Sequence, residues 1–124
     1  PVIRHGNLDS LRTIADVRDA VRAYYLLLTV NPQPGALYNI GGEHTCTVGE
    51  ILRALVQRSP HAIRMFFEPD PARMRPLDAD LQVPDCSKFK AHTGWAPKIA
   101  FDDTLDALLE YWRERVQKHR CLPR

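Results

Sequence analysis

The sequence predicts an α/β fold, and three observations support this class. Short apolar runs with strand character alternate with segments of helical periodicity in the order βαβαβ, and two more helices follow. Most of the prolines fall between these segments, where they mark turns. The apolar content of 44% and the charged content of 26% are those of an ordinary globular protein. With 124 residues, the chain is expected to form one domain, or part of one, over residues 1–124.

The first part of the chain is predicted to contain two short strands and a helix. Residues 2–5 and 13–14 are the strand candidates, and a helix is expected over residues 16–29. Asp16 and Asp19 lie near the start of this helix, where the helix dipole favours negative charge. The apolar residues of the helix have helical spacing: Val17, Val21, Tyr24 and Leu28. A turn rich in proline ends it.

The middle of the chain predicts a strand followed by a helix. Residues 36–40 are expected to form a buried strand that ends at Gly41 and Gly42. Thr47 and Glu50 have the spacing of a capping box, in which each side chain accepts a hydrogen bond from the backbone of the other residue. The helix that follows has one apolar face, made of Val48, Ile51, Leu52, Leu55 and Val56.

The last part of the chain predicts one strand and two helices. The strand is expected over residues 63–68, and an irregular charged stretch follows over residues 69–84. Asp85 is expected to cap a short helix that runs through His92. The final helix, over residues 102–118, has an apolar stripe of Leu105, Leu108, Leu109, Trp112 and Val116. Both tryptophans of the chain are predicted to lie in the core.

Composition and charge argue against several classes of function. The net charge of +2 comes from 17 basic residues interleaved with 15 acidic ones, a pattern that does not favour nucleic acid as a partner. No apolar run approaches the roughly 20 residues needed to cross a membrane. No signal-peptide pattern opens the chain, so we expect a cytoplasmic protein. The 3 cysteines and 5 histidines are scattered, which argues against a disulfide framework and against a metal site.

Two arginines lie in contexts unlike those of ordinary surface arginines. Arg12 closely precedes the expected helix, and Arg75 precedes Pro76, which restricts the backbone of Arg75 to an extended form. Paired guanidinium groups suit a diphosphate, because each presents a planar fork of donors and stays charged. Asp78 follows Arg75 closely and can accept hydrogen bonds from a ribose diol. The spacing leaves open the alternative that both arginines are solvated or form weak surface ion pairs.

Five segments in order carry a resemblance to a known family. They are Gly6-Asn7-Leu8-Asp9 with Arg12 and Asp16-Val17-Arg18-Asp19; Leu37-Tyr38-Asn39-Ile40-Gly41-Gly42 with Thr47-Val48-Gly49-Glu50; Asp70-Pro71-Ala72-Arg73-Met74-Arg75-Pro76-Leu77-Asp78; Asp85-Cys86-Ser87-Lys88-Phe89 with Thr93-Gly94-Trp95-Ala96-Pro97; and Tyr111-Trp112-Arg113. Together they resemble the extended short-chain dehydrogenase/epimerase family, and most of all its GDP-mannose 4,6-dehydratase branch. The chain departs from the pattern in having Thr13-Ile14 where the family usually has an aromatic residue.

The resemblance implies a fold, a substrate and a set of binding residues. The chain would be the C-terminal, substrate-binding portion of an extended Rossmann-fold short-chain dehydrogenase, without the Gly-rich cofactor-binding half. Arg12 and Arg75 would contact the pyrophosphate of a nucleotide sugar from two sides, Asp78 would accept from the nucleotide ribose, and Asn7 would lie near the nucleotide. The whole enzyme would be an NADP-dependent lyase that converts GDP-mannose to GDP-4-keto-6-deoxymannose.

The same resemblance implies that this chain alone is inactive. The catalytic base of the family is a tyrosine with a lysine four residues later. Four residues after the tyrosines of this chain come Leu28, Thr29, Gly42 and Arg115. The pair Gly41-Gly42 lacks the further glycine of a dinucleotide-binding turn, so a turn at a strand end is favoured over a phosphate loop. We therefore expect this chain alone to bind no cofactor and to contribute no catalytic residue.

Two alternatives remain open at this point. The architecture also serves 4-keto nucleotide-sugar reductases and epimerases, in which an acid such as Asp78 is more typical than the glutamate of the GDP-mannose branch. The chain can also be a non-catalytic binding or assembly module. In that case the apolar face left by the missing Rossmann half would be exposed, and copies of the chain would associate into a homo-oligomer.

Overall fold

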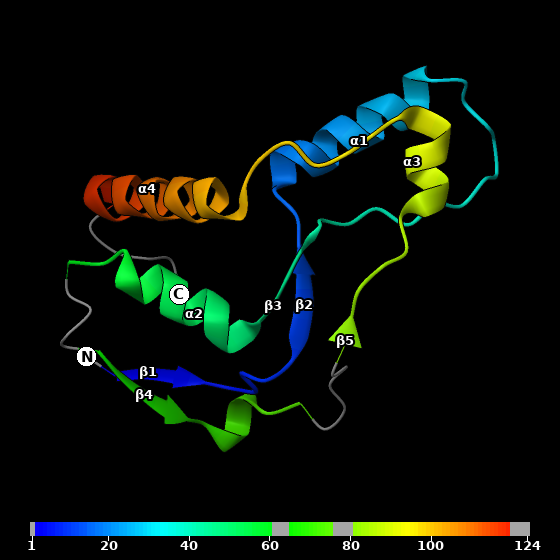
Figure 1. Cartoon of the computed structure of the whole chain (residues 1–124). Helices are drawn as coiled ribbons and strands as arrows, with labels where there is room; N and C mark the ends of the chain where they lie inside the picture. The colour runs from blue at the N-terminus through cyan, green and yellow to red at the C-terminus, as the bar shows by residue number, and fades with distance from the viewer. Residues whose placement is uncertain (1, 61–64, 76–80, 120–124) are drawn as a thin grey trace.

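The computed structural model describes residues 2–60, 65–75 and 81–119 of the chain (Figure 1). Within these ranges the elements are β1 (Val2–His5), β2 (Leu11–Ile14), α1 (Val17–Thr29), β3 (His44–Thr47), α2 (Val48–Gln57), β4 (Phe66–Pro69), the 3-10 helix η2 (Pro71–Arg73), β5 (Leu81–Gln82), α3 (Ser87–Thr93) and α4 (Phe101–His119). The α/β class predicted from the sequence is therefore confirmed.

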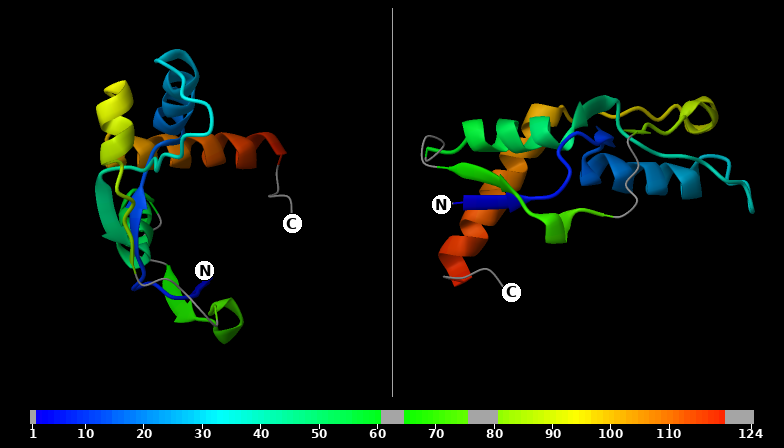
Figure 2. Two further views of the ribbon diagram at one scale, coloured as in Figure 1. Left: turned by 90° about the vertical axis from the view of Figure 1, so that its right-hand side faces the viewer. Right: turned by 90° about the horizontal axis from the view of Figure 1, so that it is seen from below.

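The strands form two small sheets. β1 pairs in parallel with β4, and Val2 lies opposite Phe66. In the second sheet β2 is central, with β3 antiparallel to it on one side and β5 parallel to it on the other. Figures 1 and 2 show β1 and β4 at one end of the molecule and α1 and α3 at the opposite end, while α2 and α4 contact each other.

Two helices begin as the sequence predicts. The helix expected over residues 16–29 is α1, and its N-cap Asp16 accepts a hydrogen bond from the backbone N–H of Arg18 at 2.8 Å. At α2 the capping box is present: Thr47 Oγ1 accepts from the Glu50 N–H at 3.1 Å, and the Glu50 carboxylate accepts from the Thr47 N–H at 2.7 Å. Local hydrogen bonding therefore defines both helix starts.

Two other boundaries differ from the prediction. The N-cap position of α3 is Cys86 rather than Asp85, although Asp85 Oδ1 still accepts from the Ser87 N–H at 2.9 Å. The strand expected over residues 63–68 is observed as β4, at Phe66–Pro69. Residues 63 and 64 lie outside the described part of the chain.

The prediction of a strand over residues 36–40 is wrong, because this segment belongs to neither sheet. Its exposure alternates as in a strand: Leu37 is 84% exposed, whereas Tyr38 and Ile40 pack on the core. Its hydrogen bonds are not those of a sheet: the Ala36 N–H donates to the Gln33 carbonyl oxygen at 3.1 Å, and Lys88 Nζ donates to the Leu37 carbonyl oxygen at 2.9 Å. Gly41 and Gly42 lead into β3, which pairs with β2 in its place.

The buried core lies between α1 and α3. It consists of Ala23, Phe89 and Trp95, and Leu26, Leu27, Tyr38 and Ile40 pack against it. The prediction that Trp95 is a core residue is confirmed, because its side chain is 1% exposed. The same prediction for Trp112 is wrong: Trp112 is 42% exposed on α4, where the described residues do not cover it.

Two buried carboxylates connect α1 to the segment that leads into α4, and we call this region the α1–α4 joint. Asp19 Oδ2 accepts from the backbone N–H groups of Lys98 and Ile99, both at 2.9 Å. Asp16 Oδ2 accepts from Thr104 Oγ1 at 2.9 Å. Hydrogen bonds from Arg18 hold the pKa of the Asp16 carboxyl well below its usual range. The joint therefore contains ionised and fully hydrogen-bonded acids.

Candidate functional site

The side chain of Asn7 makes two hydrogen bonds within the loop between β1 and β2. Asn7 Oδ1 accepts from the Asp9 N–H at 2.9 Å, and Asn7 Nδ2 donates to Ser10 Oγ at 2.8 Å. Ser10 itself is buried. Such an Asx turn fixes the backbone of the loop, so Asn7 has a structural role in addition to any contact with a ligand.

The N-terminus of α2 is fastened to this loop. The Val48 N–H donates to the Ser10 carbonyl oxygen at 3.1 Å, and the Gly49 N–H donates to the Leu8 carbonyl oxygen at 2.8 Å. With Glu50 bonded to Thr47 Oγ1, the first backbone donors of the helix are engaged within the protein. Any anion bound nearby must therefore be held mainly by side chains.

A second loop approaches from β4 and η2. The Asp70 N–H donates to the His5 carbonyl oxygen at 2.8 Å, which ties the end of β4 to the end of β1. A Cβ atom added to Gly6 would lie 2.5 Å from the carbonyl oxygen of Arg73. The two loops thus pack so closely that only glycine fits at position 6 without a shift of the backbone.

These loops enclose a pocket of about 230 Å³. Its lining residues are Gly6, Asn7, Arg12, Val48, Arg73 and Arg75. The structure therefore brings together Asn7, Arg12 and Arg75, three of the four residues that the sequence singled out. The fourth, Asp78, lies outside the described residues. We call this cavity the arginine pocket.

The arginine pocket has the charge expected of an anion site. Three arginines line it, and none of its lining residues within the described part of the chain is acidic. Arg12 extends from β2, where Gln82 of β5 is its neighbour in the sheet. Its Nη1 donates to the Leu11 carbonyl oxygen at 3.0 Å. Guanidinium groups match phosphate oxygens in geometry as well as in charge.

Arg73, the third arginine of the pocket, was not predicted from the sequence as a site residue. A local signal was present, because Asp70 and Pro71 are typical of the start of a short helical turn. In the structure Asp70 Oδ1 accepts from the Ala72 N–H at 3.0 Å, and this bond begins η2. The turn brings Arg73 and Arg75 to the same pocket.

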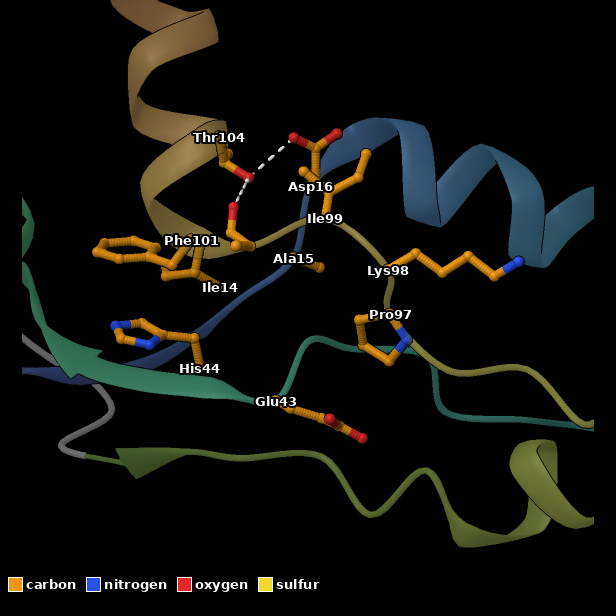
Figure 3. Close-up of a pocket in the computed structure, with 11 residues that line it drawn as sticks. Ile14, Ala15, Asp16, Glu43, His44, Pro97, Lys98, Ile99, Phe101 and Thr104 are labelled. Carbon is orange, nitrogen blue, oxygen red and sulfur yellow. Dashed lines mark hydrogen bonds between the residues drawn. The ribbon is translucent and has the colours of Figure 1, made fainter.

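A second pocket, of about 290 Å³, lies beside the α1–α4 joint (Figure 3). His44 stacks on Phe101 at one side, with ring centroids 3.9 Å apart. Its acids are already paired: Glu43 with Lys90, and Asp16 with Arg18 and Thr104. Because its charges are mixed and internally compensated, this pocket is less suited to an anion than the arginine pocket.

The turn at Gly41 and Gly42 does not have the open form of a phosphate loop. A Cβ atom on Gly42 would lie 1.7 Å from the carbonyl oxygen of Ile14, and one on Gly41 would lie 2.4 Å from Pro84 Cγ. Both glycines therefore allow close packing against the chain itself, whereas a dinucleotide turn leaves that space for pyrophosphate. These residues do not fit a nicotinamide dinucleotide.

Among the described residues, the Cys46 thiol is not activated and no metal cluster is found. Burial raises the pKa of the Cys46 thiol, as expected for an unreactive cysteine. In the described ranges, no set of three or more histidine, cysteine, aspartate or glutamate side chains is arranged to hold a metal ion. None of the described helices is long and apolar enough to pass through a bilayer.

Comparison with known proteins gives several matches. A protein-family model described as GDP-mannose 4,6 dehydratase matches residues 1–108. The chain is 29% identical over 113 residues to GDP-6-deoxy-D-mannose reductase of Pseudomonas aeruginosa. It is 31% identical over 124 residues to dTDP-glucose 4,6-dehydratase of Haemophilus influenzae. These matches cover 91% and 90% of this chain but 36% and 35% of those proteins, so the chain spans about a third of their length.

Solved structures show the same fold. The structure of RMD from Pseudomonas aeruginosa in complex with NADPH is 27% identical with a TM-score of 0.79, and the match covers 93% of this chain and 37% of that chain. A UDP-glucose 4-epimerase from Bifidobacterium longum, in complex with NAD+ and UDP, has a TM-score of 0.76 at 22% identity and covers 90% of this chain and 35% of that chain. At that identity the likeness to the epimerase concerns the fold alone. Both matches fit a C-terminal portion of a larger enzyme.

Proposed function

The chain belongs to the GDP-mannose 4,6-dehydratase family of extended short-chain dehydrogenases/reductases, and we propose that it is the part of such an enzyme that binds the diphosphate of a nucleotide sugar. The observation that carries this proposal is the arginine pocket, which is lined by Arg12 of β2, Asn7 of the loop between β1 and β2, and Arg75, which follows η2. A pocket lined by guanidinium groups suits a ligand with charged phosphate oxygens. In this proposal Asp78 accepts hydrogen bonds from the nucleotide ribose.

For the whole enzyme, we propose GDP-mannose as the substrate and GDP-4-keto-6-deoxymannose as the product. The reaction oxidises C4 of the hexose, eliminates water across C5–C6 and returns a hydride to C6. NADP, bound by the Rossmann half of the whole enzyme, would supply the chemistry of hydride uptake and return. The residues of this chain hold the diphosphate and thereby orient the hexose, so that binding energy remote from the reacting atoms contributes to the rate.

A reductase fits the same observations equally well. The P. aeruginosa relative is a GDP-6-deoxy-D-mannose reductase, and a diphosphate site of this kind serves either reaction. An epimerase of nucleotide sugars has the same fold among the solved structures. The difference between these reactions lies in the catalytic groups, none of which we assign to this chain.

The proposed site is tested by titrating the chain with GDP-mannose and GDP in a calorimeter. Arg12→Ala and Arg75→Ala should each weaken binding by about 1–3 kcal/mol, because each removes charge-assisted hydrogen bonds. Arg115→Ala is the control, since Arg115 is exposed on α4 and does not line the pocket. Unchanged affinity in both pocket variants would contradict the assignment.

We also propose that the rest of the enzyme covers one face of α1. Its apolar stripe is exposed within the described structure: Val17 (72%), Val21 (60%), Tyr24 (60%) and Leu28 (74%). A stripe of this kind is typical of a buried helix face. It also supports the alternative of an assembly module, in which a second copy covers the stripe. Light scattering tests that alternative, and a monomer at all concentrations would contradict it.

We place the whole enzyme in the cytoplasm, on the basis of its thiols. Cys46 and Cys86 are both buried and unpaired by disulfides. Free buried thiols are typical of reducing compartments. Fractionation of cells that express a tagged chain tests this placement, and recovery outside the cytoplasmic fraction would contradict it.

A further inference from the structure

The arginine pocket contains a cation to which the resemblance gives no role. Arg73 lines the pocket together with Arg12 and Arg75. Its Nε donates to Asp70 Oδ2 at 3.2 Å, and this is the only hydrogen bond of its side chain among the described residues. Asp70 therefore engages the inner edge of the guanidinium group and leaves both terminal nitrogens, Nη1 and Nη2, for a ligand.

The position of Arg73 is fixed by the backbone around it. The Arg73 N–H donates to the Asp70 carbonyl oxygen at 2.9 Å, and Asp70 is itself bonded to the His5 carbonyl oxygen at 2.8 Å. On the other side, the Arg73 carbonyl oxygen lies against Gly6, where no larger residue fits. Arg73 is thus anchored to the end of β1 through two contacts, unlike an arginine on a loose surface loop.

We propose that Arg73 is a third cationic contact for the diphosphate and that Asp70 is its positioning residue. This inference rests on the proposed function of the pocket and deepens it. Three guanidinium groups exceed what a single phosphate group needs, whereas a diphosphate offers oxygens on two phosphorus atoms. The pocket therefore selects a diphosphate over a monophosphate, and Arg73 contributes to that selection.

The alternative is that Asp70 and Arg73 form an ordinary surface ion pair that stabilises η2. Arg113 offers a matched control for this case. It is an arginine on the exposed surface that also pairs with an acid three residues earlier, Glu110, at 3.9 Å, and it lies on α4 outside the pocket. If Arg73 has only a local structural role, replacing either arginine should have the same small effect.

The experiment uses the whole chain, with inorganic pyrophosphate, inorganic phosphate and GDP as calorimetric probes. Arg73→Ala should weaken pyrophosphate binding about tenfold or more, because it removes a charge-assisted contact. It should weaken phosphate binding clearly less, so the preference for pyrophosphate falls. Arg73→Lys keeps the positive charge, so its pyrophosphate affinity should lie between that of Arg73→Ala and that of the unaltered chain. Arg113→Ala should bind pyrophosphate like the unaltered chain.

The outcomes separate this inference from the proposed function. Pyrophosphate affinity that is unchanged in Arg73→Ala overturns the inference, and so does an equal loss for pyrophosphate and phosphate. If the unaltered chain binds pyrophosphate but not GDP, the nucleotide-sugar function is contradicted. The role of Arg73 is then decided by the pyrophosphate affinities of its own variants. If the unaltered chain binds none of the three probes, both are overturned. Urea unfolding of each variant shows whether any loss of binding reflects loss of the fold.

Discussion

The α1–α4 joint and the arginine pocket use the same two residue types in opposite ways. At the joint, buried Asp16 and Asp19 are surrounded by donors, including Arg18 and Arg22. At the pocket, arginines come together and no acid is among the described lining residues. Carboxylates saturated by donors hold two parts of the fold together, whereas arginines that outnumber the nearby acids suit an external anion.

We expect this difference to separate residues that serve stability from residues that serve binding. Asp19 accepts hydrogen bonds from Arg22, Lys98 and Ile99, and it is 2% exposed. Arg75, by contrast, is an exposed residue that lines a cavity. A change at the joint should therefore affect unfolding, and a change at the pocket should affect ligand affinity.

The largest expected effect is the loss of Asp19. Asp19→Ala should lower the free energy of unfolding by about 3–5 kcal/mol, because it leaves buried donors and Arg22 without their partner. Urea unfolding followed by circular dichroism measures this loss. Asp103→Ala is the control, since Asp103 is an exposed residue in the first turn of α4. A loss at Asp19 no larger than that of the control would show that the joint does not hold the fold together.

The second-largest expected effect is a loss of stability at low pH, caused by the two carboxyls of the joint. Burial raises the pKa of Asp19, but hydrogen bonds from Arg22, Ile99 and Lys98 outweigh it, and the net pKa is lowered. Because the pKa of Asp16 is lowered as well, the stabilisation is complete above the usual value of 3.8 and is lost as the pH falls below it. The free energy of unfolding should therefore be nearly constant at neutral pH and fall steeply in acid.

The control for this pH dependence is the variant Asp16→Asn/Asp19→Asn. It should be less stable at neutral pH but should lose less further stability in acid, because the two carboxyls no longer titrate. Urea midpoints measured over a series of buffers give both curves. If the urea midpoints of the unaltered chain and of the double variant fall in parallel as the pH is lowered, other groups cause the acid sensitivity.

The smallest expected effects are the stability changes caused by replacing one arginine of the joint and one arginine of the pocket. Arg22→Ala should cost about 1–3 kcal/mol of stability, because Arg22 donates to buried Asp19 at 2.8 Å. Arg75→Ala should change stability by no more than about 0.5 kcal/mol, as is usual for exposed positions. Thermal unfolding of both variants measures this difference in stability. A larger loss for Arg75 than for Arg22 would reverse the division between joint and pocket.

Local signals in the sequence predicted much of the fold. The N-cap at Asp16 and the capping box at Thr47 and Glu50 depend on hydrogen bonds between residues close in sequence, so their spacing is sufficient to find them. The buried position of Trp95 followed from its place after a helix end at Gly94. Each of these features is determined by neighbours in the chain.

Features that depend on distant partners were harder to predict. Residues 36–40 have the alternation of a strand, but no pattern in the sequence shows whether a partner strand is present. Trp112 has the spacing of a core residue, yet the described residues leave it half exposed. Arg73 was missed because its approach to the pocket depends on the packing of Gly6 against its backbone.

The segment at residues 36–40 also affects how the isolated chain should behave in concentrated solution. This segment belongs to neither sheet, so we expect its backbone groups that are not bonded within the chain to be able to pair with the same segment of another molecule. Leu37, exposed to 84%, would add an apolar contact to such a pairing. We therefore expect the isolated chain to form ordered aggregates slowly during storage, which thioflavin T fluorescence would detect. Replacing Leu37 with lysine places a charge on this segment and should delay the formation of the aggregates.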